Sequence, residues 1–342
     1  MEIIVPAAGA SSRFPDMKPK YLLYDYGHKM MIQRALEPYK QHNITIGILK
    51  EHDETYNASD YLRHEFGYEP KICILDKITR GPADTVYQII KNSISIDLDA
   101  ELLIKDCDSF FDHDISEGNY ICVSNIAQHE VLKKLSSKSF VIANEQGIVT
   151  DIIEKNVVSD TFCVGGYKFA SARIFCEAFE ELKLHEEIFV SDVIQRCLHK
   201  GHIFTEKLVS NYIDVGTAQD WFEYNDKPVI FCDIDGTLIE SQGRVGGKSF
   251  DSPIVLMNKS VERLLEYQKN GAQFIFTTAR PKDVERITYS MLVTLGFRNF
   301  QLIMGLQNSR RILINDFNNA NPYPRATAIN VERDKDQVAN YL

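Results

Sequence analysis

Apolar and polar positions alternate with two different periods along the first two hundred residues. Short apolar runs of strand length are separated by segments in which apolar residues recur every three or four positions, the spacing of one helix face. The predicted strands are Ile3–Val5, Ile44–Leu49, Ile72–Leu75, Leu102–Ile104 and Tyr120–Val123. The predicted helices are Met30–Tyr39, Tyr56–Glu65 and Ala83–Lys91. Strands that alternate with helices indicate βαβ units and a mostly parallel sheet.

From Phe140 onward the predicted strands follow one another without a helix between them, which indicates an inserted antiparallel section. These strands are Phe140–Ala143, Val149–Glu154 and Thr161–Phe169. The remaining elements before the first domain ends are helices Ala172–Leu182, Val190–His199 and Ala218–Tyr224, and short strands near Ile203 and at Tyr212–Asp214.

A polar turn that ends in Pro228 marks the predicted domain boundary, and the alternation restarts after it. The predicted elements are a strand from Val229, helices Lys259–Asn270 and Pro281–Leu295, and strands Gln273–Thr277, Gln301–Met304 and Ile312–Ile314. We therefore expect an α/β protein of two doubly wound domains, residues 1–225 and 226–342. The Gly-containing segment Glu240–Pro253 is too short for a separate domain and predicts a small flap.

Composition narrows the class of partner. The 342 residues carry a formal net charge of −10, which argues against nucleic acid or an anionic membrane as the main partner. Seven scattered cysteines form no C-x-x-C pair, which is typical of reduced thiols. No apolar run approaches membrane-spanning length, and a strand begins at residue 2 without a signal peptide before it. We expect a cytoplasmic protein, and a homo-oligomer stays open.

Two aspartates follow the strand that begins at Val229. Asp233 and Asp235 stand two positions apart and precede the turn Gly236-Thr237. Open α/β sheets bind ligands at the carboxyl ends of their strands. A carboxylate there can attack phosphorus, while a second carboxylate handles the proton of the leaving group. This D-x-D-G-T pattern resembles motif one of the haloacid dehalogenase-like phosphatase superfamily.

The resemblance implies a phosphatase site for the second domain, with a Rossmann-like sheet and a minimal cap. Asp233 would be the nucleophile and Asp235 the general acid and base. Thr278, in Thr-Ala-Arg-Pro, matches motif two, which hydrogen-bonds the phosphoryl group. Asp316, in Asn-Asp-Phe, resembles motif four and would complete a Mg²⁺ site with Asp233 and Asp235.

The second domain departs from that pattern at motif three. The superfamily has a lysine there, whereas the nearest cations before the last predicted strand are Arg310 and Arg311. Either arginine can neutralise a phosphate, although a guanidinium places its charge differently from an ammonium. A degenerate domain without activity stays open.

A run of small residues follows the first predicted strand and ends in Arg13. Small side chains let backbone N–H groups approach phosphate closely, and Arg13 adds a forked cation. The spacing is not that of a Walker A loop. Together with Lys18-Pro19-Lys20, Arg80–Thr85 and Ile213–Thr217, this loop resembles the sugar-phosphate nucleotidyltransferase family over about residues 2–224.

This second resemblance implies a nucleotide site in the first domain. Arg13 would contact the departing pyrophosphate, and Lys20 would neutralise charge at the α-phosphate. The implied nucleotide-binding residues are Ala7, Ala8, Gly9, Ala10, Ser11, Ser12, Gly81, Pro82, Ala83, Asp84, Thr85 and Asp106.

The same resemblance places a metal and an acceptor. Asp108 and Asp214 would hold one Mg²⁺, whose other ligands are phosphate oxygens and water. The implied acceptor residues are Glu154, Lys155, Gly165 and Gly166. Two plainer interpretations stay open: Asp214 as a helix-capping residue, and Glu154-Lys155 as an exposed ion pair.

We therefore expect a bifunctional enzyme with one Mg²⁺ in each site. The first domain would join an NTP to a phosphorylated sugar or polyol, and the second would hydrolyse a phosphate monoester, for a surface polysaccharide precursor. The opening Ala-Ala-Gly looks closer to cytidylyltransferases than to hexose-1-phosphate thymidylyltransferases, which favours CTP. The alternatives are a phosphatase regulated by a silent nucleotide-binding module, and a transferase with an inert second domain.

Overall fold

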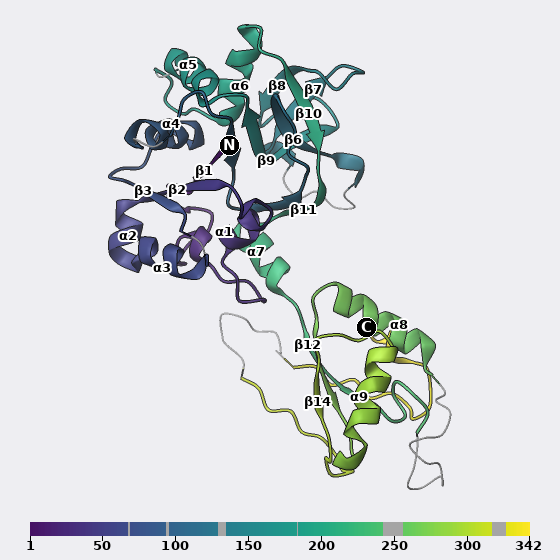
Figure 1. Cartoon of the computed structure of the whole chain (residues 1–342). Coiled ribbons are helices and arrows are strands. Elements are labelled where there is room, and N and C mark those ends of the chain that lie inside the picture. Colours follow the sequence, from purple (N-terminus) through teal and green to yellow (C-terminus); the bar gives the residue numbers. More distant parts are fainter. Residues whose placement is uncertain (68, 94–95, 129–134, 183, 242–255, 317–325) are drawn as a thin grey trace. The chain divides into compact units, whose positions relative to one another are not determined.

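The computed structural model describes residues 1–67, 69–93, 96–128, 135–182, 184–241, 256–316 and 326–342. The chain divides into two compact units, Met1–Asn225 and Asp226–Leu342 (Figure 1). Each unit has its own sheet and its own apolar core.

Among the residues that the structure describes, a nine-stranded mixed sheet organises the first unit. Its main path runs β10 (Phe204–Leu208), β6 (Asn119–Asn125), β9 (Thr161–Phe169), β4 (Leu102–Lys105), β1 (Glu2–Pro6), β2 (Asn43–Leu49) and β3 (Lys71–Leu75). The strands β4, β1, β2 and β3 are parallel, whereas β9 runs antiparallel to both β4 and β6. The hairpin β7 (Ser139–Ala143) and β8 (Val149–Glu154) joins the sheet through β9, and β5 (Ser109–Asp112) pairs with β11 (Ser210–Asp214).

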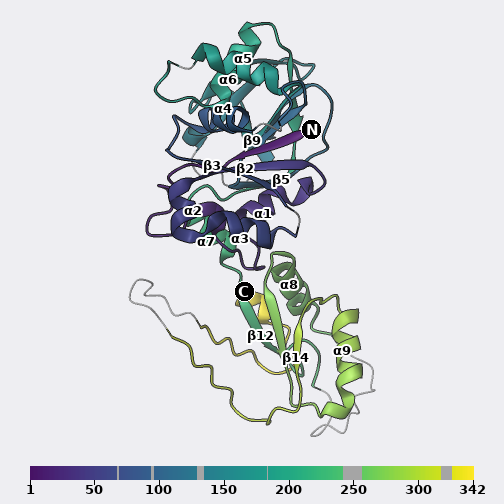
Figure 2. The same ribbon diagram turned by 60° about the vertical axis from the view of Figure 1, so that its left-hand side comes forward.

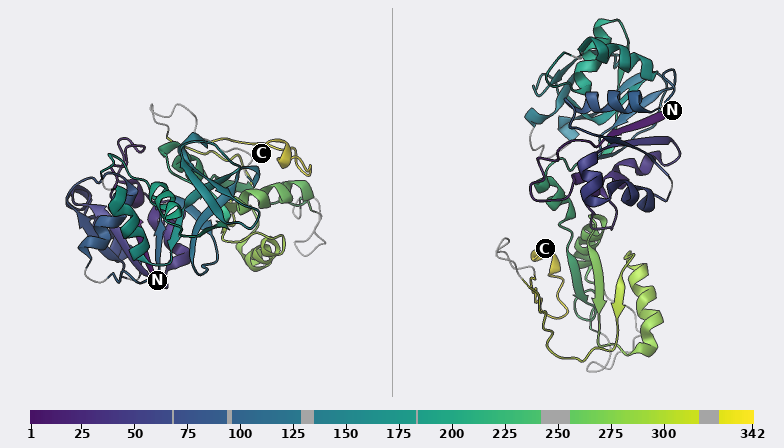
Figure 3. Two further views of the ribbon diagram at one scale, coloured as in Figure 1. Left: turned by 90° about the horizontal axis from the view of Figure 1, so that it is seen from above. Right: turned by 90° about the vertical axis from the view of Figure 1, so that its left-hand side faces the viewer.

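Helices cover both faces of this sheet, as Figures 2 and 3 show. They are α1 (Met31–Leu36), α2 (Lys50–Tyr56), α3 (Ala58–Glu65), α4 (Pro82–Asn92), α5 (Ala172–Leu182), α6 (Val190–His199) and α7 (Ala218–Asn225). Short 3-10 turns lie at Lys20–Leu22, Glu37–Tyr39, Ile126–Gln128 and Leu135–Ser137. Successive side chains of a strand point to opposite faces. Ile4 therefore packs with α4, while Ile3 and Val5 pack with α1 and α3.

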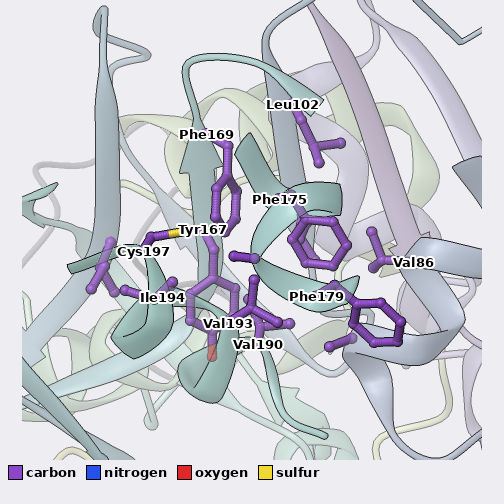
Figure 4. Packing of buried hydrophobic residues seen from close by; sticks show 14 of the residues in the cluster. Val86, Leu102, Tyr167, Phe169, Phe175, Phe179, Val190, Val193, Ile194 and Cys197 are labelled. Carbon is purple, nitrogen blue, oxygen red and sulfur yellow. The ribbon is translucent and has the colours of Figure 1, made fainter. Parts of the chain in front are cut away.

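Aromatic side chains fill the core between the sheet and the helices α4, α5 and α6 (Figure 4). Phe169 on β9 contacts Phe175 edge-to-face, with ring centroids 5.3 Å apart. Phe179, one helical turn further along α5, stacks on Tyr87 of α4 at 4.4 Å. These contacts fix the helices relative to the strands that carry the site.

A half-buried histidine links the turn after α1 to the sheet. His113 Nδ1 lies 3.0 Å from the hydroxyl of Tyr39, and its Nε2 lies 3.0 Å from the hydroxyl of Tyr120. Burial, aided by the charge of Lys105, lowers the pKa of His113 to about 4. The imidazole is therefore neutral at neutral pH and accepts one hydrogen bond while it donates the other.

The predicted alternation of the first unit is confirmed as a mixed α/β architecture with a mostly parallel sheet. The antiparallel section after Phe140 is confirmed as well, in β7, β8 and β9. The predicted single helix from Tyr56 is wrong at its start, because Asn57 adopts φ 50° and ψ 43° and separates α2 from α3. The strand β5 and the helix α2 were not predicted.

In the part of the second unit that the structure describes, three parallel strands form a sheet that is accompanied by two α-helices. The sheet order is β12 (Val229–Asp233), β13 (Gln273–Thr277) and β14 (Gln301–Ile303). The helices are α8 (Asn258–Lys269) and α9 (Glu285–Thr294), with 3-10 turns at Lys282–Val284 and Val338–Asn340. Buried side chains of both helices belong to one apolar core with side chains of the sheet, so both helices pack on the same face. Cys232, Phe274 and Phe276 of that face are buried.

The opposite face of this sheet differs from the prediction of a doubly wound domain. Phe231 is 54% exposed there, and Val229 and Ile303 are exposed as well. A doubly wound sheet requires strand order to reverse, and the order of the strands among the described residues, β12, β13 and β14, does not reverse.

The predicted strand at Ile312–Ile314 is wrong. These residues carry no strand hydrogen bonds in the structure, and Ile314 is 90% exposed. An apolar triplet alone does not supply the backbone partners that define a strand. Asp316 therefore does not follow a strand of the sheet. Most of the predicted flap Glu240–Pro253 lies outside the described residues.

Across the described part of the chain, no helix combines the length and the apolar character needed to cross a membrane. All seven cysteines are free, and five of them are buried.

Candidate functional site

The loops after β1 and β4 meet because these two strands are parallel neighbours, with Ile4 opposite Ile104. The loop after β1 forms a pocket, which is lined by Pro6, Ala7, Gly9, Ala10, Ser11, Ser12, Arg13, Phe14 and Lys20. Ser11 has a φ of 51° and accepts a hydrogen bond on its carbonyl from the N–H of Phe14, which closes the turn. A Cβ at Gly9 would meet open space, so this part of the loop is accessible to a ligand.

Two cations of the first loop converge on the carboxylate of Asp108, which follows β4. The ammonium of Lys20 donates to Asp108 Oδ2 at 2.6 Å, and Arg13 Nη2 lies 3.3 Å from the same oxygen. Burial raises the pKa of Asp108, but Lys20 and Arg13 lower it further, so that it lies well below its usual range. Burial lowers the pKa of Lys20, and Asp108 more than restores it. Both groups are charged at neutral pH.

The pairing of β11 with β5 brings Asp214 to the same place. Asp214 lies opposite Ser109 in the register, and the N–H of Val215 donates to the carbonyl of Asp108 at 3.0 Å. A Cβ built on Gly216 would lie 3.0 Å from Asp214 Oδ1 and 3.3 Å from Asp108 Oδ2. The two carboxylates therefore border one small space that only glycine leaves open.

This space fits a divalent cation by the chemistry of its oxygen donors. No cluster of three or more His, Cys, Asp or Glu side chains that could hold a metal occurs among the described residues. Two carboxylates with phosphate oxygens and water are the ligand set that Mg²⁺ takes at phosphoryl-transfer sites.

A lysine that the sequence analysis did not select completes this cluster. The ammonium of Lys138, which directly precedes β7, donates to Asp214 Oδ2 and lies 2.8 Å from the hydroxyl of Tyr212. Burial lowers the pKa of Lys138, while Tyr212 and Asp214 raise it, and the result lies above its usual value. A lone lysine before a strand gave no signal in the sequence.

Lys105 ends β4 and Asp106 follows it, just before Asp108 in the chain. Lys105 is fully buried and donates to the carbonyls of Asp106 and Ser109, both at 2.7 Å, and to the hydroxyl of Ser109 at 3.0 Å. Burial lowers its pKa to about 8. Burial and the neighbouring Asp108 raise the pKa of Asp106 to about 6. Lys105 thus shapes the turn that presents Asp108.

The expected base-contacting segment lies at the start of α4, with Pro82 and Ala83 in the first turn. Gly81 has a φ of 130°, and a Cβ there would lie 2.5 Å from the carbonyl oxygen of Ile188. Asp84 is buried and binds Arg80, with Arg80 Nε at 3.0 Å. The Thr85 hydroxyl lies 3.2 Å from the carbonyl of Gly81. Asp84 and Thr85 therefore hold the loop in shape.

Glu154 ends β8, on the strand pair expected to face the acceptor. Its Oε2 accepts hydrogen bonds from Ser139 and, at 2.6 Å, from Ser191. Lys155 has a φ of 55° and its ammonium lies 4.0 Å from the ring centroid of Phe189. Glu154 and Lys155 therefore bind protein groups and do not form an ion pair with each other.

Gly165 and Gly166 lie on β9 where it passes β4. A Cβ on Gly165 would lie 2.6 Å from Asp106 Oδ2, and a Cβ on Gly166 would lie 2.8 Å from the ring of Phe111. Their lack of side chains therefore permits the close approach of β9 to the turn after β4.

In the second unit the strand ends of β12 and β13 bring three predicted residues together. Asp233 ends β12, and Thr278 follows β13, with its hydroxyl 3.3 Å from Asp235 Oδ2. Arg280, almost fully buried, binds Asp235 with both arms of its fork, at 2.9 and 2.8 Å. The role of Arg280 was not predicted, although the Thr-Ala-Arg-Pro motif contains it.

Of the remaining predicted residues of this site, all of which the structure describes, only Arg311 contacts one of its carboxylates. Arg311 Nη2 lies 3.5 Å from Asp233 Oδ1, whereas Arg310 and Asp316 are exposed in a segment without secondary structure. Burial raises the pKa of Asp233, and the charge of Arg311 opposes this shift.

The N-terminal part of the chain shares its fold with several solved structures. A nucleoside-diphosphate-sugar pyrophosphorylase from Vibrio cholerae RC9 matches 65% of this chain and 98% of its own, at 19% identity and a TM-score of 0.56. The inositol-1-phosphate CTP transferase from T. maritima matches 64% and 90%, at 15% identity and a TM-score of 0.54.

A structure from Bacillus anthracis, described as a glucose-1-phosphate thymidylyltransferase in complex with sucrose, covers 66% of this chain and 93% of its own. Its identity is 20% and its TM-score 0.53. At such identities the likeness shows the fold alone. No protein-family model matches the chain. No curated protein matches it either.

Proposed function

We propose that the first unit transfers a nucleotidyl group from an NTP to a phosphorylated sugar or polyol and releases pyrophosphate. The observation that carries this proposal is the convergence of Arg13, Lys20, Asp108 and Asp214 beyond the carboxyl ends of β1 and β4. Open α/β sheets bind ligands at that edge. The fold shared with nucleotidyltransferases supports the same activity.

The chemistry follows from these side chains. An oxygen of the acceptor phosphate attacks the α-phosphorus of the NTP; that O–P bond forms while the bond from the α-phosphorus to the bridging oxygen breaks. Pyrophosphate leaves with the bond electrons. Lys20, which lines the pocket, neutralises charge on the α-phosphate, and the more exposed Arg13 meets the departing pyrophosphate. A Mg²⁺ held by Asp108 and Asp214 would supply further charge neutralisation for the phosphate oxygens.

CTP is the nucleotide we propose, and a sugar or polyol phosphate of a surface polysaccharide pathway is the acceptor. The Ala-Ala-Gly opening supports CTP, and one of the similar structures is described as an inositol-1-phosphate CTP transferase. The others are described as a nucleoside-diphosphate-sugar pyrophosphorylase and a thymidylyltransferase, so the experiment has to compare bases.

Pyrophosphate release with each of the four NTPs and a panel of sugar and polyol phosphates tests this proposal. We expect release that requires Mg²⁺, is highest with CTP, and falls at least about a hundredfold in Asp108→Asn. Absence of release with every pair of substrates, from folded protein, contradicts it.

A second candidate activity is phosphate-monoester hydrolysis in the second unit, and the arrangement around Asp233 favours it. Asp233 ends a parallel strand, Thr278 directly follows the next strand, and Asp235 is held in orientation by its two contacts with Arg280. Asp233 would attack phosphorus to give an aspartyl-phosphate, which water then hydrolyses. Release of phosphate from p-nitrophenyl phosphate in the presence of Mg²⁺ should disappear in Asp233→Asn. Equal release by the variant excludes this activity.

A further inference from the structure

Lys138 and Ser139 are consecutive residues that connect two parts of the first site. The side chain of Lys138 contacts Asp214, and the side chain of Ser139 contacts Glu154. The carbonyl of Lys138 also accepts a hydrogen bond from the N–H of Lys155 at 3.0 Å. One dipeptide thus joins a predicted metal carboxylate to the strand end expected to face the acceptor.

Lys138 binds a carboxylate that a divalent cation would also need. Its ammonium lies on Asp214 Oδ2, while Asp214 Oδ1 borders the space beside Asp108. Only 15% of the lysine side chain is exposed, against 33% for Asp214, so the ammonium lies inside the site and not at its rim. Its charge also acts on Asp108. A carboxylate that already binds an ammonium has less negative potential to offer a divalent cation.

We propose that Lys138 competes with the divalent cation for Asp214 and, when displaced, binds the phosphate of the acceptor. The acceptor phosphate has to approach the α-phosphate near Lys20, which binds Asp108. Lys138 directly precedes β7, the partner strand of β8, and its ammonium lies on Asp214, the other predicted metal carboxylate. This proposal rests on the proposed nucleotidyl transfer for its second half only.

Titration of Mn²⁺ into the full chain without nucleotide, followed by electron paramagnetic resonance, tests the first half. We expect Lys138→Met to bind Mn²⁺ about five- to tenfold more tightly than wild type. This factor lies at the low end of the affinity changes by which one bound group usually affects another. Lys138→Arg should restore the wild-type affinity. Lys200→Met, which breaks an exposed pair with Glu181, is the matched control and should change nothing.

A merely structural lysine would lower thermal stability without tightening Mn²⁺ binding. Unchanged or weaker binding in folded Lys138→Met overturns the proposal, as does the absence of Mn²⁺ binding in both proteins. If Lys138→Met does not fold, Tyr212→Phe removes the 2.8 Å hydrogen bond to the ammonium and should tighten binding by a smaller factor. In Asp214→Asn, Lys138→Met should have no further effect.

Steady-state kinetics test the second half. Lys138→Met should raise the KM for the acceptor about tenfold and change the KM for the NTP by less than about twofold. Equal changes in both constants overturn the role at the acceptor. If wild type shows no transfer, the proposed function fails, whereas the Mn²⁺ result still decides the competition at Asp214.

Discussion

Lys20 and Lys105 lie close to each other in the first site, and we predict opposite consequences when each is replaced by methionine. Lys20 faces the pocket and shares Asp108 with Arg13. Lys105 is fully buried and donates to the carbonyls of Asp106 and Ser109. Methionine keeps much of the length of either side chain and removes its charge.

The magnitudes follow from what each lysine leaves behind. In Lys20→Met the carboxylate of Asp108 keeps Arg13 at 3.3 Å and is partly exposed, so the free energy of unfolding should fall by only about 1 kcal/mol. The phosphate loses one preorganised charge, which is worth about 10²–10³ in kcat. In Lys105→Met the carbonyls of Asp106 and Ser109 lose a fully buried charged donor at 2.7 Å, which should cost about 3 kcal/mol.

Thermal unfolding followed by circular dichroism and pyrophosphate release separate the two outcomes. For a unit of this size, about 3 kcal/mol corresponds to a Tm lower by roughly 6–12 °C, and about 1 kcal/mol to roughly 2–4 °C. We expect Lys20→Met to be stable and nearly inactive, and Lys105→Met to be unstable. The reasoning is refuted if Lys20→Met loses as much stability as Lys105→Met, or if it retains wild-type kcat.

Three further predictions concern other parts of the structure. His113 binds fewer protons in the folded than in the unfolded state between its folded pKa of about 4 and its ordinary value of about 6.5, so its contribution to stability is lost as the pH falls through that window. Wild type should therefore lose free energy of unfolding between pH 7 and pH 4.5, as measured by urea unfolding. After a discount for partial exposure, His113→Gln should lose about 2 kcal/mol less than wild type over the same pH range. Gly216→Ala should lower kcat about tenfold or more with little change in Tm, because its Cβ would crowd Asp214 at 3.0 Å. Arg280→Met should destabilise the second unit by about 3 kcal/mol, since the half-buried Asp235 loses a bidentate partner.

Each of these has a contrary result that is easy to recognise. An unchanged pH dependence in His113→Gln would mean that the imidazole titrates alike in both states. Wild-type kcat in Gly216→Ala would mean that the carboxylates tolerate the methyl group. For Arg280→Met, the double variant with Asp235→Asn should recover part of the lost stability, and a further loss would contradict the ion-pair argument.

Much of the first site was predictable from sequence because its residues directly follow strands that the sequence pattern assigns to one parallel sheet. The strands Ile3–Val5 and Leu102–Ile104 are apolar and short, and helical segments separate them. Such a pattern commits both strands to one parallel sheet. The loop ending in Arg13 and the turn bearing Asp108 then lie at the same edge, as the 3.3 Å contact between them shows.

Residues that depend on antiparallel or buried contacts were harder to predict. Lys138 reaches Asp214 only because β7 joins the sheet through β9 and β11 pairs with β5, and neither pairing has a local signal. Arg280 is polar in sequence yet nearly fully buried, because Asp235 provides the charge that makes its burial favourable.

By itself, therefore, the sequence determined the alternation of elements in the first unit and the residue types at the strand ends. Hydrophobic period and turn residues are local properties, and they specify which segments become strands and helices. The tertiary structure decided which charges meet. It placed Lys138 on Asp214, and it left Ile312–Ile314 exposed where a strand was expected. Those outcomes depend on backbone partners and counter-charges from distant parts of the chain, which a local pattern does not contain.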